Sequence, residues 1–158
     1  MEFGMPTLIE AAGLDACAAL CRQLGLEFVE LNMNMPQYQL DVFDEAYAAE
    51  VAAKHGIYYT LHLDGNLNVC DFNPYVAKAY TRTVLESIAL AKRLRMPVLN
   101  MHLHDALGKK NHLALGTGEM DIGKYLRLAQ AQSCRVVLET KTIEGLKASV
   151  RWVRDRYR

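Results

Sequence analysis

The segment MPVLNMHLH, residues 96–104, decides between the fold classes open to this chain. It has the length and apolar content of a buried β-strand, and successive side chains of a strand point to opposite faces. Asn100, His102 and His104 therefore share one face, and the other face is apolar. A parallel sheet covered by helices on both sides is normally apolar on both faces. One polar face instead predicts a barrel wall, with helices packed outside and polar groups inside.

Other strand-like runs repeat this one-sided polarity. They are EFGMPTLIE (2–10), GLEFVELNMN (25–34), GIYYTLHLDG (56–65) and CRVVLETK (134–141). The polar residues that share a face near the C-terminal ends of the last three runs include Glu30, Asn32, Thr60, His62 and Glu139. Active sites of (β/α) barrels lie at the C-terminal ends of the strands. We therefore expect these side chains to meet at one site, and buried polar groups without a function are the alternative.

Helical stretches separate the strands. They are residues 13–24, 44–56, 73–96, 121–131 and 142–156. Their ends have recognisable caps, since Asn73 precedes Pro74, Asp121 and Thr142 precede apolar periodic runs, and Gly56 follows the second stretch. Five βα units in series predict an α/β fold with a parallel sheet and right-handed crossovers.

The loop GKKNHLALGTGEMD (108–121) has the composition of an anion-binding turn. Glycine-rich backbone that leads into a helix N-terminus can bind phosphate or carboxylate, so Lys110, Gly116 and Gly118 are candidate substrate-binding residues. A turn that requires positive φ is the alternative for each glycine. Asp105, just before this loop, could orient a neighbouring histidine or cap the loop, and the sequence leaves both roles open.

The composition of the chain limits which binding partners and which cellular compartment we expect. The 158 residues contain 18 basic and 18 acidic side chains, so net charge predicts neither nucleic acid nor an anionic membrane as a partner. The chain has no apolar run of 18 residues and no signal-peptide pattern at its start. Its four cysteines form no CxxC motif. We expect reduced thiols and a cytoplasmic location.

Motifs along nearly the whole chain resemble one known family. They are LGLEFVELNMNMPQYQ (24–39), YYTLHLD (58–64), PVLNMHL (97–103), HLHDALGKKNHLALGTGEMDI (102–122) and CRVVLETKTIEGLKASV (134–150). They resemble the sugar phosphate isomerase/epimerase group of xylose-isomerase-like TIM barrels, which also includes endonuclease IV. The resemblance implies a small-molecule sugar or sugar phosphate as substrate.

The resemblance also implies a divalent metal ion (Mn, Co, Zn, Ni or Mg). Its ligands in the family are a glutamate, an aspartate, a histidine and a final glutamate from late strands. His102 or His104 falls at the histidine position and Glu139 at the final glutamate, so these three are the expected metal ligands. Glu139 and His62 are the expected catalytic residues. The implied substrate-binding residues are Glu30, Asn32 and His112.

The chain also departs from the family pattern. Family members have eight βα units, whereas residues 1–158 provide five and are expected to form a single shortened domain. PVLNMHL resembles the fourth strand and MHLHDALGKKNH the seventh, so one strand is expected to serve as both. The missing middle units would supply two of the four metal ligands. We expect a partial barrel completed by oligomerisation, and a flavodoxin-like doubly wound sheet is the alternative.

Three functions remain open at this point. The first is metal-assisted proton transfer next to a sugar carbonyl, impaired by the missing ligands. The second is a catalytically silent barrel scaffold that self-associates. The third, cleavage of damaged DNA as in endonuclease IV, needs more histidines and carboxylates than the chain contains.

Overall fold

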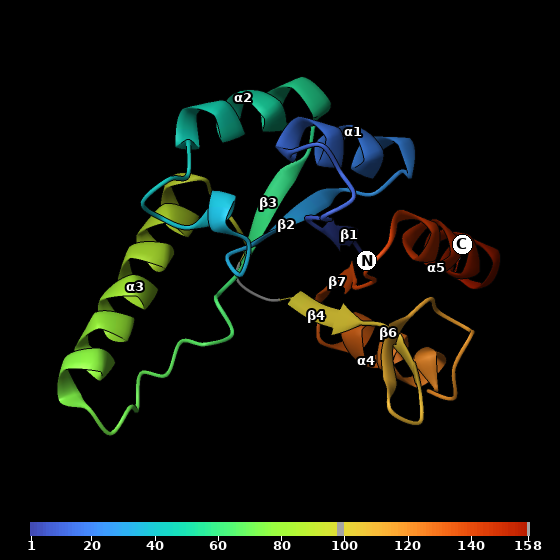
Figure 1. Cartoon of the computed structure of the whole chain (residues 1–158). Helices are drawn as coiled ribbons and strands as arrows, with labels where there is room; N and C mark the ends of the chain where they lie inside the picture. The colour runs from blue at the N-terminus through green and yellow to red at the C-terminus, as the bar shows by residue number, and fades with distance from the viewer. Residues whose placement is uncertain (98–99, 158) are drawn as a thin grey trace.

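The structure is a computed structural model that describes residues 1–97 and 100–157 (Figure 1). Residues 98 and 99, within the predicted strand 96–104, lie outside the described part. No helix in the described residues is long and apolar enough to cross a bilayer.

Five parallel strands form the main sheet, in the order β3-β2-β1-β7-β4. In chain order they are β1 (Phe3–Pro6), β2 (Phe28–Asn32), β3 (Tyr58–His62), β4 (Asn100–Leu103) and β7 (Arg135–Leu138). All five predicted strands are confirmed. Pro6 is the last residue of β1, a position where its missing N–H costs no ladder bond.

The five predicted helices are also confirmed. They are α1 (Leu14–Gln23), α2 (Glu45–His55), α3 (Pro74–Arg93), α4 (Ile122–Ala131) and α5 (Ile143–Arg156), with a short 3-10 turn, η1 (Pro36–Tyr38). The side chains of Asn73, Asp121 and Thr142 each accept a hydrogen bond from a backbone N–H of the first helical turn. These bonds satisfy donors that the helix itself leaves free, which explains why the helices begin there.

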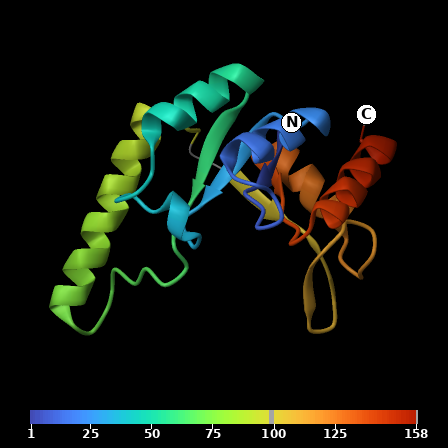
Figure 2. The same cartoon turned by 45° about the horizontal axis from the view of Figure 1, so that its top comes forward.

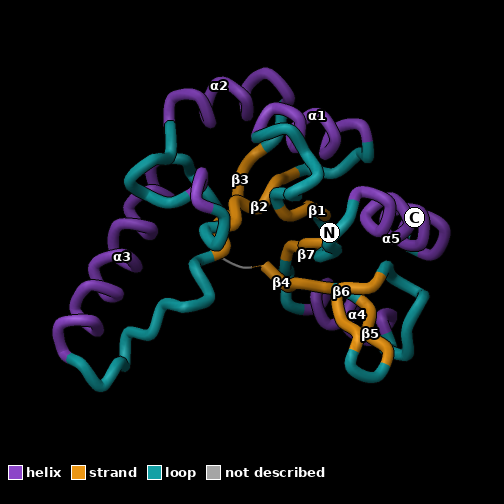
Figure 3. Tube along the Cα trace, viewed as in Figure 1, coloured by secondary structure: helices purple, strands orange, loops and turns teal. Residues whose placement is uncertain are grey.

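The two faces of the sheet differ, as the alternation predicted. Buried apolar side chains on the outer face, such as Val29, Val136 and Leu138, pack in one core with residues of α1, α2, α4 and α5. The inner face instead bears Glu30, with only 2% of its surface exposed. Figure 3 shows α1, α2 and α5 around the outer side of the curled sheet, with α3 apart at one side. An apolar wall against helices and a polar interior are features of a barrel wall.

The strand order identifies which part of a barrel is present. In a closed eight-stranded barrel the last strand pairs with the first, and here β7 pairs with β1. Strand β4 pairs with β7, so it takes the place of the strand before the last, the seventh. The expectation that this strand also serves as the fourth is wrong, because β3 pairs only with β2 among the described strands. The first strand lies between the second and the last, which is not the flavodoxin-like order.

Helix α3 connects the two edges of the sheet, from β3 to β4. Figure 2 shows it standing to one side of the curled sheet. Arg93 near its end pairs with Glu45 of α2, and Ser87 Oγ lies 3.6 Å from Met33 Sδ. Leu85 and Ile88 of the same helix are 61% and 46% exposed.

The predicted loop 108–121 begins with an element that the sequence analysis missed. Strands β5 (Asp105–Leu107) and β6 (Lys110–Leu113) form an antiparallel hairpin. Gly108 at its turn has a φ of 57°, in the left-handed region that a two-residue hairpin turn requires. Gly108, and the alternation of polar and apolar residues on either side of it, were the sequence signals for this hairpin.

Candidate metal and sugar site

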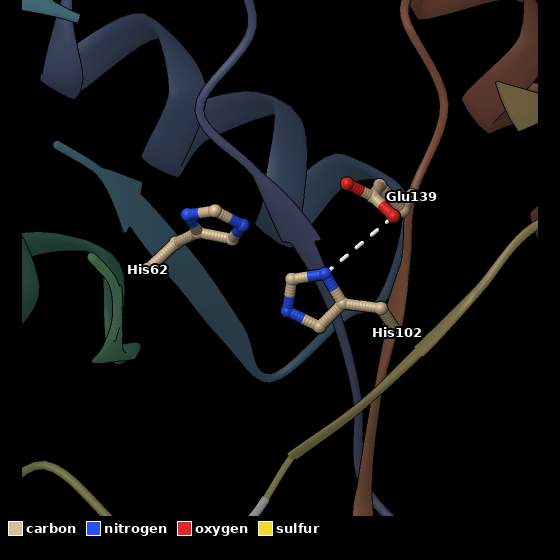
Figure 4. Close-up of side chains that lie close together, drawn as sticks. All are labelled: His62, His102 and Glu139. Atoms are coloured by element: carbon tan, nitrogen blue, oxygen red, sulfur yellow. Dashed lines mark ion pairs between the residues drawn. The ribbon is translucent and has the colours of Figure 1, made fainter. Parts of the chain in front are cut away.

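His62, His102 and Glu139 meet at the C-terminal ends of three strands (Figure 4). His62 ends β3, His102 lies in β4, and Glu139 directly follows β7. Strands β3 and β4 are the two edges of the sheet, yet the centres of the two imidazole rings lie 5.3 Å apart because the sheet curls. His102 Nδ1 lies 3.5 Å from Glu139 Oε2.

Glu30 of β2 holds the opposite side of the His102 ring. Its carboxylate oxygens lie 3.0 Å from His102 Nε2. The side chains of Asn100 and Thr60 donate to the same carboxylate, at 3.3 Å and 3.5 Å. The predicted substrate residue Glu30 therefore contacts a histidine from inside the barrel, and His102 lies between two carboxylates.

These contacts shift two pKa values in opposite directions. Hydrogen bonding to Glu139, and then to Glu30, raises the pKa of His102 to about 10, although burial opposes the charged form. Its contact with His102 lowers the pKa of Glu139 to about 2, again against the effect of burial. In the metal-free protein His102 is therefore a cation and Glu139 an anion at neutral pH.

The donor set of this cluster fits a divalent ion. One ligating atom each from His62, His102 and Glu139 lie within 4.8 Å of one another. Two donors each about 2.1 Å from one tetrahedral ion lie roughly 3.4 Å apart, close to the separation of His102 Nδ1 and Glu139 Oε2. His62 Nδ1 lies 2.7 Å from the Leu63 carbonyl oxygen, to which it can donate, so its Nε2 is available for a metal.

His104 and His112 form a second group with Glu139. Their rings stack with centres 4.5 Å apart, and His112 Nε2 lies 3.3 Å from Glu139 Oε1. The expected ligands His102, His104 and Glu139 thus fall into two groups that share Glu139.

The carboxylate of Asp105 fills the predicted anion-binding loop (108–121). Its buried carboxylate accepts backbone N–H bonds from Ala106, Gly116, Gly118 and Met120 at 2.9–3.1 Å. Burial opposes ionisation of Asp105, but these four donors outweigh it and lower its pKa. Of the two roles left open for Asp105, the structure shows the loop cap. Lys110 is exposed in β6.

A pocket of about 400 Å³ adjoins the cluster. Asn32, His112 and Glu139 line it, together with Thr7, Thr140 and Lys141. Its volume falls within the usual range of small-molecule sites. The sequence analysis did not single out Thr7 or Lys141, although Lys141 comes two residues after Glu139 at the end of the predicted strand, and this position was the available signal.

The fold and this cluster define a partial (β/α) barrel with histidines and carboxylates at its strand ends. Among solved structures, a D-tagatose 3-epimerase-like protein matches with a TM-score of 0.77 and 12% identity, over 99% of this chain and 97% of that one. A D-allulose 3-epimerase from Methylomonas sp. matches with a TM-score of 0.62 and 9% identity, over 99% and 98% of the two chains. The structure of a D-allulose 3-epimerase from Methylomonas sp. in complex with D-allulose matches with a TM-score of 0.61 and 10% identity, over 99% of this chain and 97% of that one.

The chain therefore shares the fold of these 3-epimerase structures, a barrel-type fold that the sequence resemblance predicted. At these identities the likeness establishes the fold alone. No protein-family model matches the chain. No curated protein matches its sequence either.

Proposed function

We propose that this protein binds a sugar and moves a proton at the carbon next to its carbonyl, as an epimerase or isomerase does. The convergence of His62, His102 and Glu139 beside a pocket of about 400 Å³ is the observation that supports this most directly. The fold shared with sugar 3-epimerases, one of them solved with D-allulose, supports a sugar as the substrate class.

A divalent ion held by His62, His102 and Glu139 would polarise the carbonyl and an adjacent hydroxyl of the sugar. Glu30 orients His102 through its other ring nitrogen, the arrangement in which carboxylates commonly support metal-binding histidines. Mn, Co, Ni and Zn all accept such mixed nitrogen and oxygen ligands, and Mg is less suited to imidazole.

Glu139 is the proposed base. It lines the pocket, and its carboxylate can accept a proton from a carbon beside it. His62 is the second proposed catalytic group, because it would hold the ion beside Glu139, and the proton that Glu139 accepts would return from its carboxyl group to the same carbon or its neighbour. Asn32 and His112 line the same pocket and are the proposed sugar contacts. Gly116 and Gly118 are less suited to bind substrate, because their N–H groups already donate to Asp105.

The test is exchange of solvent deuterium into D-allulose, followed by NMR, with the metal-free protein and with each ion added. We expect incorporation at the carbon next to the carbonyl only with metal, and its loss in Glu139→Gln. Glu144→Gln is the matched control, because Glu144 is an exposed glutamate on α5. Absence of exchange with every ion, for D-allulose and for phosphorylated ketoses alike, would contradict the proposal.

A second candidate is a catalytically silent scaffold that self-associates. The two edges β3 and β4 of the partial barrel, and the exposed Leu85 and Ile88 of α3, favour it. An apolar pocket of about 260 Å³ between β3 and α3 lies at the same side. Solution mass measured together with metal content tests it, and a metal-loaded monomer would contradict it.

We further propose that the chain forms a single shortened barrel domain and works in the cytoplasm. The four cysteines, all free in the structure, support a reducing compartment. Quantitative thiol labelling of protein isolated from intact cells would test this, and disulfide-bonded protein would contradict it.

A further inference from the structure

We propose that two copies of this chain associate through antiparallel α3 helices, with Phe72 of each copy seated in an apolar pocket of the other. The pocket has a volume of about 260 Å³. It lies between the two edges of the sheet, because Leu61 of β3, Ile88 of α3 and Asn100 of β4 all line it. This association requires no assumption about the sugar reaction, so it applies to an enzyme and to a silent scaffold alike.

Exposed apolar side chains are concentrated in one segment, residues 63–88, which runs from the end of β3 into α3. They are Leu63, Val69, Phe72, Tyr75, Leu85 and Ile88, each at least 36% exposed. Tyr75 is 84% exposed and Phe72 is fully exposed. Single apolar residues scattered over a surface need no explanation, but a group of them in one region indicates an interaction surface.

Phe72 and the pocket lie toward opposite ends of the same helix, which favours a second copy as the partner. Helix α3 begins at Pro74, whereas its pocket-lining residues Val84, Ile88 and Ala91 lie in its second half. Pro74 and Ile88 are separated by about 21 Å along the axis, at a rise of 1.5 Å per residue. Figure 1 shows the beginning of α3 far from the sheet, where a second molecule can reach it.

An antiparallel pair of these helices brings the beginning of each one beside the second half of the other. A two-fold axis then places both Phe72 side chains in both pockets at once. This is the closed, self-complementary type of contact that homodimers commonly form. Aromatic side chains seated in pockets are also the groups that contribute most to such interfaces.

Charged side chains on the two surfaces are complementary in the same arrangement. Lys92 lines the pocket, is exposed and has no ion-pair partner among the described residues. Asp71 directly precedes Phe72, and its Oδ1 accepts the backbone N–H of Asn73, which leaves Oδ2 for a cation. With Phe72 in the pocket, Asp71 comes to its rim beside the partner's Lys92. Opposite charges placed in this way fix the register of an interface.

The pocket also adjoins the candidate site through the wall of the barrel. Asn100 lines the pocket and donates its side-chain N–H to Glu30, which holds His102. Leu61 and Leu63, which line it too, flank His62 in the sequence. An aromatic side chain in the pocket would therefore exclude water from the outer side of the wall behind the site.

The first test is analytical ultracentrifugation of the whole protein over a range of concentrations. We expect a monomer–dimer equilibrium that Phe72→Gln weakens about 30-fold or more, the effect of removing a buried aromatic anchor. Ala91→Phe, which fills the pocket from within, should weaken it similarly. Leu128→Gln is the matched control, because Leu128 is 47% exposed on α4, outside this surface. Circular dichroism checks that the variants remain folded.

The second test reverses the charges at the rim of the pocket. Asp71→Lys and Lys92→Asp should each weaken the dimer, and both substitutions in one chain should restore part of the lost affinity. Such mutual rescue is the sign of a direct contact between the two side chains.

Each outcome has a defined meaning. A protein that is monomeric at every concentration would overturn the proposal. A dimer that neither Phe72→Gln nor Ala91→Phe weakens would also overturn it, because another surface, such as an open strand edge, would then join the copies. A dimer that these two variants weaken, but that shows no mutual rescue between Asp71→Lys and Lys92→Asp, would overturn the antiparallel pairing of α3.

Discussion

The two sides of this partial barrel differ in how completely the chain satisfies its own side chains. One side pairs a buried carboxylate with backbone donors, and the other leaves apolar side chains uncovered. On the side of β4 and β7, the buried carboxylate of Asp105 meets four backbone donors within residues 106–120. On the side of β3, helix α3 leaves Leu85 and Ile88 exposed. The first side is held by contacts close in sequence, so it keeps its structure without further barrel strands. The second side has an apolar face that the described residues do not cover.

The largest expected effect is that of Asp105→Ala. It leaves up to four buried N–H groups without an acceptor, and we expect a loss of about 3–5 kcal/mol in the free energy of unfolding. Urea denaturation measures this. Asp121→Ala is the control, because it removes a single helix-capping bond and should cost about 1 kcal/mol. Equal losses of unfolding free energy in the two variants would show that Asp105 does not stabilise the side of β4 and β7.

A substitution at Gly118 tests the same side through its packing. A methyl group there would collide with the carbonyl oxygen of Ala106 and with the Asp105 carboxylate. We expect Gly118→Ala to cost about 2–3 kcal/mol, an overpacking effect. Gly108→Ala is the matched control, since Gly108 has open space around it but a positive φ, and it should cost about 1 kcal/mol. Thermal unfolding of both variants measures the two losses of stability. A larger loss in Gly108→Ala than in Gly118→Ala would contradict the packing argument.

The ion pair between His102 of β4 and Glu139 after β7 links two neighbouring strands and predicts a pH dependence for the metal-free protein. The raised pKa of His102 means that its contribution is complete below pH 6.5 and is lost as the pH rises through about 10. The lowered pKa of Glu139 means that its contribution is complete above pH 4.5 and is lost as the pH falls through about 2. Stability from this pair is therefore greatest between pH 4.5 and 6.5.

The expected loss outside that range is roughly 1–2 kcal/mol, because water screens a pair that is partly exposed. NMR titration of the His102 ring together with denaturation at several pH values measures it. Glu139→Gln should lower the pKa of His102, with Glu30 preserving part of the shift. A ring that titrates near 6.5 in the unmodified protein would contradict the ion pair.

The smallest expected effect on stability is on the α3 side. Leu85→Gln with Ile88→Gln should change the free energy of unfolding by less than about 0.5 kcal/mol per site, because both side chains are exposed. If this face binds a second copy, the same double variant should weaken self-association in analytical ultracentrifugation. Lys78→Gln, on the same helix, is the control. A loss of stability of several kcal/mol would instead mean that Leu85 and Ile88 are buried in the folded protein.

Much of the fold could be predicted because local signals agreed with one another. The caps Asn73, Asp121 and Thr142 start helices where expected, and alternation in residues 96–104 placed His102 on the inner face. The hairpin β5–β6 was missed because its strands are short and its residues were interpreted as one loop. Alternation also cannot show distance along a curled sheet. The contact of Glu30 with His102, across strands that are not neighbours, depends on that curl.

The place of β1 in the sheet has a consequence for how the protein is made. As the chain leaves the ribosome, β1 can pair with β2 early, but its other partner, β7, begins only at Arg135, after β3, α3 and β4 have been synthesised. One edge of the nascent sheet thus stays open until β7 has been synthesised. Such late, non-local pairing is slow and exposes strand edges to wrong partners, so we expect newly made chains to rely on chaperones during this interval.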